Sequence, residues 1–233
     1  MRIRPGRMRS LGSSLAIVAF CGAACLILSP AASGRHGKRA SCGPARAQTV
    51  VADRVARVYR VPAGHGPFGN LYDYYGCALG NAKPRLVARA ASRPRGVRVY
   101  GCGGQGCWLV TAIRLVGAKV GVIVEYHGID FVDGTLTVRD LADDRVLHRF
   151  RTDWIAPGYG VRLITCVLAP SGNVAWSTET SSAPGHHGII HRAVGKAFST
   201  LDSGPNVVAS SLRLRGDTLE WIDGSEQRRA SLT

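Results

Sequence analysis

Residues 113–124 have the sequence Ile-Arg-Leu-Val-Gly-Ala-Lys-Val-Gly-Val-Ile-Val, in which two short apolar runs flank Gly117. Runs of this length that are rich in valine and isoleucine favour strands, and a glycine between them suits the positive φ that tight hairpins require. Two later stretches repeat the pattern around their own central glycines, at residues 166–176 and 212–221. The repeated apolar hairpin predicts an all-β fold.

A second, more polar hairpin follows each of the first two copies, at residues 135–150 and 188–201. Four strands in about 40–50 residues, with apolar inner strands and solvent-facing outer strands, match one blade of a β-propeller. The chain beyond its N-terminal region would hold roughly four such units, so we expect a β-propeller-like array of about four antiparallel blades. The strand at 55–61 would complete the last blade if the ring closes. An open array or a β-sandwich is the alternative.

Residues 138–150 are similar to the outer hairpin of WD40-like propellers, with the pattern V-x-D-x-x-x-G-x-x-x-x-x-F, except that Asp144 stands where the pattern has glycine. The Tyr-Gly-Cys at 75–77 and the stretch 174–221 resemble a group of uncharacterised exported proteins of high-GC bacteria. The resemblance covers residues 55–233. It implies a propeller-like all-β body and assigns no activity.

The N-terminus has the features of an export signal: four arginines without an acid, then a 14-residue apolar run at 15–28. A bilayer span needs about 20 apolar residues, so we expect cleavage after Ser33, with an uncleaved anchor as the alternative. This gives a signal peptide at 1–33, a basic flexible linker at 34–53 and a propeller-like domain at 54–233. We therefore expect a secreted, extracellular protein that contacts a membrane only through its signal segment.

The formal net charge is +15, and eight of the 30 basic side chains precede residue 48. The strong excess of arginine over lysine is typical of high-GC codon usage and does not indicate a nucleic-acid partner. The span between Asp73 and Glu125 contains no acid, and its basic residues lie between positions 83 and 119. Such a span could attract an anionic cell-surface polymer through counterion release. The arginines predicted to bind such a ligand are Arg89, Arg93, Arg95 and Arg98.

Cysteine usage agrees with export, because an oxidising compartment allows disulfides and no C-x2-C zinc spacing occurs. Five cysteines follow the signal segment, so one thiol is left over. We expect the unpaired one to be Cys42, in the basic linker. The candidates for pairing, with their connectivity open, are Cys77, Cys102, Cys107 and Cys166.

Tryptophans are candidates for stacking against a ligand. Trp176 and Trp221 occupy matching places in the repeat, which favours packing between blades. Trp154 lies near Tyr159 in a Pro/Gly-containing stretch, so these two residues are the candidate ligand contacts.

Metal, cofactor and catalytic motifs are not recognisable. On a strand, His187 and His191 would lie about 13 Å apart, too far to share an ion. The densest titratable group is Glu125 with His127 and Asp130, and no common hydrolase signature accompanies it. We expect no cofactor and no metal, and we name no catalytic residue.

The sequence therefore favours a non-catalytic binding or scaffold module at or outside the cell surface. One alternative is a polyanion-binding protein that uses the basic segment 83–119. Another is a secreted hydrolase without a recognisable motif, in which Glu125, His127 or His187 would have to converge on a pocket.

Overall fold

The computed structural model describes residues 42–66, 69–92, 106–128, 132–151, 160–182 and 185–233, which belong to one compact unit. All regular secondary structure in these residues is β, which confirms the all-β prediction. No helix in the described part of the chain has the length and apolar character to cross a membrane.

Fifteen strands make up the described residues. They are β1 (Gln48–Ala52), β2 (Ala56–Gly66), β3 (Gly69–Ala78), β4 (Asn81–Ser92), β5 (Cys107–Val116), β6 (Lys119–His127), β7 (Val132–Asp140), β8 (Arg145–Arg151), β9 (Gly160–Leu168), β10 (Val174–Ser182), β11 (Gly185–Val194), β12 (Ala197–Gly204), β13 (Val207–Arg215), β14 (Thr218–Asp223) and β15 (Glu226–Ser231).

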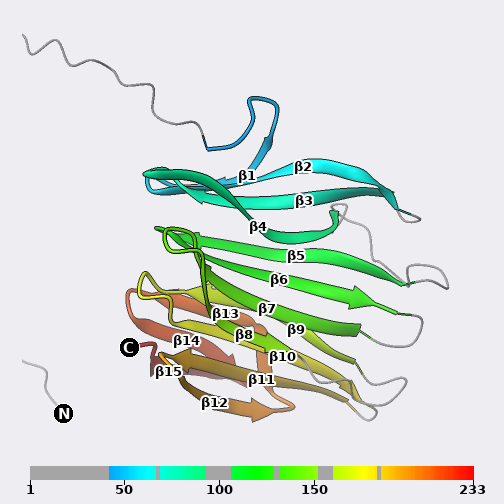
Figure 1. Ribbon diagram of the computed structural model, residues 1–233. Coiled ribbons are helices and arrows are strands. Elements are labelled where there is room, and N and C mark those ends of the chain that lie inside the picture. The colour runs from blue at the N-terminus through cyan, green and yellow to red at the C-terminus, as the bar shows by residue number, and fades with distance from the viewer. Residues whose placement is uncertain (1–41, 67–68, 93–105, 129–131, 152–159, 183–184) are drawn as a thin grey trace, which may run out of the picture. The chain divides into compact units, whose positions relative to one another are not determined.

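The strands form three sheets of consecutive neighbours: β1 to β8, β9 to β12, and β13 to β15 (Figure 1). Every pairing is antiparallel except that of β4 with β5, which is parallel and spans only Ala91↔Leu109 and Ser92↔Val110. The eight-stranded sheet therefore consists of two four-stranded meanders joined by a short contact. The described residues form three four-stranded units, followed by one three-stranded unit.

The ends of the chain do not share a sheet in the described residues. We expected residues 55–61 to complete the last unit, but β2 pairs with β1 and β3, and β15 pairs with β14 alone. That expectation is wrong, because the nearby strand β1 supplies a local antiparallel partner for β2. The propeller-like array of blades therefore stays a prediction, with closure of the ring left open.

The turns of the repeated hairpins have the predicted chemistry. Gly117, Gly172 and Gly216 adopt φ of 56°, 93° and 58°, values that a residue with a Cβ adopts at a steric cost. Asp144 adopts φ of 57°, the one positive value among described non-glycine residues. It stands where the WD40-like pattern has glycine, so the backbone conformation explains why glycine is common there.

Three apolar cores hold the units together, each built from the facing sides of successive meanders. The first, between β1–β4 and β5–β8, includes Val58, Tyr74, Ala90, Val120 and Val122. The second, between β5–β8 and the β9–β12 sheet, includes Ile123, Leu136, Val138, Leu163, Cys166 and Trp176. The third, between the β9–β12 and β13–β15 sheets, includes Ala175, Ile190, Leu212, Leu219 and Trp221. Trp176 and Trp221 thus pack between units, as their place in the repeat predicts.

Residues 42–53, the described part of the predicted linker, contact the first meander. Cys42 forms a disulfide with Cys77, with 6.0 Å between their Cα atoms. Arg57 donates hydrogen bonds to the carbonyl oxygens of Cys42 and Ala47, at 3.0 and 3.1 Å. These contacts hold the segment on the outer face of the first meander, where Cys42, Tyr59 and Cys77 form a small core.

Two cysteine predictions are therefore corrected. Cys42, expected to be unpaired, is bonded, and Cys166, expected to pair, is free and buried. Cys166 lies in the second core, and burial raises the pKa of its thiol to about 11. Cys107 is disulfide-bonded, as expected of a candidate, while Cys102 lies outside the described residues.

Replacing Cys42 and Cys77 together by serine should lower the free energy of unfolding by about 3–4 kcal/mol, because the cross-link closes a long loop in the unfolded chain. The measurement is urea unfolding at neutral pH, without reductant. Cys166→Ala, which removes one buried sulfur, is the matched control and should cost less than about 2 kcal/mol. Equal losses in the two variants would contradict a stabilising role for the bridge.

Candidate functional site

A groove opens beside the second core, between β8 and the part of the β9–β12 face that β5–β8 do not cover. It encloses about 490 Å³, which is within the range of small-molecule sites. Strand alternation places the lining residues of β9, β10 and β11 on one face of their sheet, and β8 borders the groove from the neighbouring sheet. The lining residues are Arg149, Phe150, Arg151, Val161, Leu163, Trp176, Thr178, Ile189, His191 and Phe198.

Four aromatic side chains form one cluster in the groove, in which Phe198 lies 5.6 Å from Trp176 and 6.1 Å from Phe150. The ring centroids of Phe150 and Trp176 are 4.1 Å apart, with 26° between their planes. His191 follows at 5.2 Å and 28° from Trp176, and Phe198 at 5.6 Å and 27° from His191. Trp176 is 4% exposed and Phe198 is 55% exposed. The cluster therefore extends from the core to the solvent, where Phe198 exposes an aromatic ring.

The imidazole of His191 is held between two threonine hydroxyls. Its Nε2 lies 3.3 Å from Thr178 Oγ1, and its Nδ1 lies 3.2 Å from Thr200 Oγ1. Burial lowers the pKa of His191 to about 4, since the protonated form would lose its hydration. At neutral pH His191, and with it the aromatic cluster, is therefore uncharged.

Positive charge lies on β8 at one side of the groove. Arg149 and Arg151 are both exposed residues that line it. Arg151 donates from Nε and Nη2 to Asp133 Oδ2, at 2.9 and 2.6 Å, which fixes its guanidinium. The groove thus combines an apolar stacking surface with cationic groups beside it.

A second cavity of about 420 Å³ lies where β3, β4 and β5 come together, and its lining includes Leu71, Arg89, Ala91 and Trp108. Beneath this region, Glu125 and His127 of β6 are buried and form a hydrogen bond of 3.0 Å between Oε2 and Nε2. This cavity has fewer convergent polar groups than the groove, so the groove is the stronger candidate.

The described titratable residues that were named from the sequence do not form one site, and Asp130 lies outside the described residues. His187 lies on β11, where its Nε2 is 2.8 Å from Ser203 Oγ, on a different sheet from Glu125 and His127. His186 lies 3.3 Å from Glu179, and His191 is in the groove. Within the described residues, no three His, Cys, Asp or Glu side chains are placed to hold a metal ion.

Most ligand contacts predicted from the sequence lie outside the described residues: Trp154, Tyr159, Arg93, Arg95 and Arg98. Arg89 is described, and it binds Asp73 through Nε and Nη2, at 2.5 and 2.9 Å. The hydrogen bonds from Arg89 are the main cause of the lowered pKa of Asp73. This guanidinium is therefore already engaged with a carboxylate.

Other cations of the basic segment also have carboxylate partners. Arg85 contacts Asp144 at 2.7 Å, and Lys119 forms an ion pair with Asp140. The segment is free of acids in the sequence, but the fold brings acids to it from β3 and from the β7–β8 hairpin. The predicted positive face is therefore partly neutralised.

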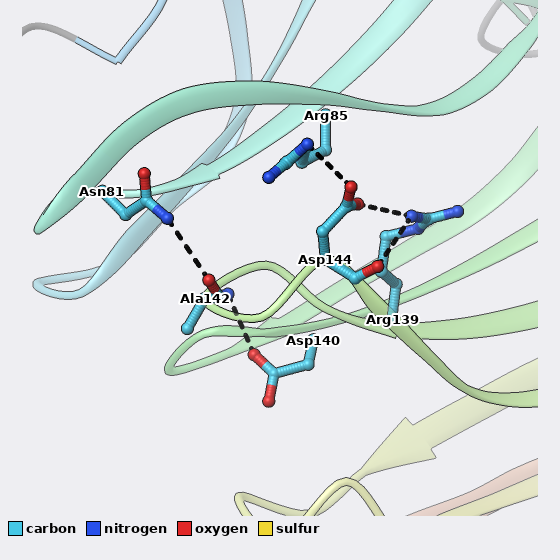
Figure 2. Close-up of polar contacts among 6 residues, drawn as sticks. All are labelled: Asn81, Arg85, Arg139, Asp140, Ala142 and Asp144. Carbon is cyan, nitrogen blue, oxygen red and sulfur yellow. Dashed lines mark hydrogen bonds and ion pairs between the residues drawn. The ribbon is translucent and has the colours of Figure 1, made fainter.

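Figure 2 shows how the β7–β8 turn is attached to the first meander. Asp144 accepts from Arg139 Nη1 at 2.6 Å and contacts Arg85 of β4. Asn81 Nδ2 donates to the carbonyl oxygen of Ala142 at 3.3 Å. This cluster joins two meanders whose strands share only the short β4–β5 pairing, so we assign it a structural role.

The sequence reasoning missed the groove residues Phe150, His191 and Phe198. Phe150 ends the WD40-like pattern, and the other two lie on strands that we interpreted as a polar outer hairpin. A signal was present, because each of β8, β11 and β12 carries an aromatic ring. The strand register pairs Trp176 with His191 and Phe198 with Ala193, and the packing of β8 against the β9–β12 sheet adds Phe150.

No family model matches the chain, and no curated protein matches it. Among solved structures, the chain is similar to one described as the crystal structure of puromycin hydrolase, with 14% sequence identity and a TM-score of 0.33. The match covers 82% of this chain and 40% of that one, so the chain spans less than half of the length of that structure. We draw no inference about function from a similarity of this extent.

Asp144→Asn should lower the free energy of unfolding by about 1–2 kcal/mol, because two partly buried ion pairs are lost while asparagine still tolerates the positive φ. Urea unfolding is the measurement. Asp143→Asn, in the same turn and with the same change of charge, is the control and should stay within about 0.5 kcal/mol of the parent. Equal losses of unfolding free energy in the two variants would contradict a stabilising role for the Asp144 ion pairs.

Stability should fall as the pH is lowered from 6.5 to about 4, in part because of His191. The unfolded chain binds a proton there that the native groove excludes, so protonation favours unfolding. His191→Gln keeps a polar side chain between the threonines and should reduce this loss, as measured by urea midpoints across the pH range. Burial also lowers the pKa of His148. This residue is present in both proteins, so its contribution to the pH dependence cancels in the comparison. An identical pH dependence would refute the role of His191.

Proposed function

We propose that this protein is an exported, non-catalytic binding protein and that the groove between β8 and β9–β12 is its ligand site. The observation that carries the proposal is the aromatic cluster of Phe150, Trp176, His191 and Phe198, in which Phe198 is exposed to solvent. The N-terminal export features and the Cys42–Cys77 disulfide support a location outside the cytosol.

The ligand that fits this chemistry best is a saccharide. One side of a sugar ring carries C–H groups with a small positive charge, and the faces of aromatic rings are negative. Thr178 supplies a polar atom beside the aromatic cluster, and the exposed Arg149 favours a sugar that carries an acidic substituent.

The side chains that line the groove favour binding of a saccharide over its hydrolysis. Glycoside hydrolysis generally uses two carboxyl groups on either side of the scissile bond. None of the described lining residues is a carboxylate, and both nitrogens of His191 already face threonine hydroxyls. The groove therefore has stacking and hydrogen-bonding groups without an acid–base pair.

We also propose that the four units form a propeller-like array. Successive four-stranded meanders with apolar cores between them support this arrangement. The outer face of the last unit carries Arg213, Arg215 and Arg229, and burying it against another sheet would be costly. An open array is therefore favoured over a closed ring.

A polyanion surface over residues 83–119 is the less favoured alternative. Its described cations Arg85, Arg89 and Lys119 are each paired with a carboxylate, so each carries less free positive charge than the sequence suggests.

The test is a titration of the full protein with a panel of neutral and acidic oligosaccharides, followed by tryptophan fluorescence and calorimetry. Phe198→Ala should weaken binding of the best saccharide by about fivefold or more, because an exposed stacking ring is lost. Val208→Ala removes an exposed apolar side chain from β13, away from the groove, and should leave the affinity unchanged. Absence of saccharide binding, or equal affinity of the Phe198 variant and the parent, would overturn the proposal.

A further inference from the structure

The last sheet has two faces of opposite character. Leu212, Leu219 and Trp221 point into the third core. The other face carries the alternate residues of the same strands, including Arg213, Glu220 and Arg229. None of the hydrophobic clusters of the described residues covers this outer face, so its side chains meet solvent.

Three arginines converge on one glutamate at the centre of that face. The register places Arg213 of β13, Glu220 of β14 and Arg229 of β15 directly opposite one another. The guanidinium nitrogens of Arg213 and Arg215 lie 3.6 and 3.2 Å from Glu220 Oε2, and that of Arg229 lies 3.5 Å from Oε1. The glutamate side chain is 6% exposed, and the three arginines are 51%, 68% and 65% exposed.

The cluster has more positive charge than its own carboxylate neutralises. Three guanidinium groups face one carboxylate, which leaves a surplus of two positive charges. Asp223 and Glu226 of the same sheet contact Arg228 instead, at 3.4 and 3.1 Å. No ion pair of the described residues joins Asp217, in the β13–β14 turn, to these arginines.

The N–H groups of the cluster are also not consumed by Glu220. The buried Oε2 of Glu220 has no hydrogen-bond partner in the described structure, although two guanidinium groups are close to it. All three ion pairs with Glu220 run through the Nε atom of the arginine, so the terminal Nη groups are the donors that would meet a ligand from the solvent side.

We propose that Arg213, Arg215 and Arg229 form a binding site for the phosphate group of a soluble ligand. The surplus charge matches a phosphate dianion, and guanidinium groups bind phosphate oxygens through paired N–H donors. Glu220 is a positioning residue that gathers the three side chains. Because the arginines stand on paired strands of one sheet, their spacing is fixed before the ligand arrives.

Calorimetric titration of the full protein with tripolyphosphate at low ionic strength tests the proposal. Arg229→Gln should weaken binding by about tenfold or more, since a charged donor pair is lost. Arg228→Gln is the matched control: it lies next in the same strand, carries the same charge change and is 50% exposed, yet it is paired with Asp223 and Glu226. It should change the affinity by less than about twofold.

Thermal unfolding of both variants confirms that the fold is retained, as expected for exposed side chains. Equal loss of affinity in the two variants would show attraction by net charge alone and would overturn the site, as would no binding of tripolyphosphate.

Phosphatidylglycerol vesicles, with phosphatidylcholine vesicles as reference, distinguish a membrane surface from a soluble ligand as the source of phosphate. Vesicle binding that tripolyphosphate does not displace would identify a membrane surface and overturn the assignment to a soluble ligand. Phe198→Ala should leave tripolyphosphate binding unchanged, because the groove is a separate site.

Discussion

Burial of one sheet face against the next is the interaction on which the rest of this structure depends. A single meander of three or four strands has apolar residues on a face that water would solvate poorly, and it gains stability only when another meander covers that face. The three cores meet this need in sequence, through Val122, Ile123 and Ile190 among others. Neighbouring residues of β6 thus serve different cores, because successive side chains of a strand point to opposite faces.

The fold class was predictable from the sequence, because the physics that sets it is local. Apolar runs predict strands, and Gly117, Gly172 and Gly216 mark the turns with the positive φ that the structure shows. The packing role of Trp176 and Trp221 also followed from their position in the repeat. These features need no knowledge of which strands become neighbours across sheets.

Features that depend on distant neighbours were not predictable. Cysteine counting cannot tell that Cys42 lies beside Cys77, which is 35 residues away. An acid-free stretch of sequence says nothing about Asp144, which the β7–β8 turn brings to Arg85. The groove was missed for the same reason. Its rings come from four strands in two sheets, and they meet only through strand pairing and the packing of those sheets. Both binding proposals use surfaces that the packing of sheets leaves uncovered.

The last sheet has one strand fewer than the other units, and this has a consequence for how copies of the protein meet. In the described residues β15 pairs with β14 alone, so its far side presents backbone donors and acceptors that another strand could join. The strand places Glu226, Arg228 and Arg229 at this margin. Like-charged arginines brought together by strand addition would repel, and their hydration would be lost. The charged side chains of β15 thus disfavour the addition of a strand from another copy at this edge.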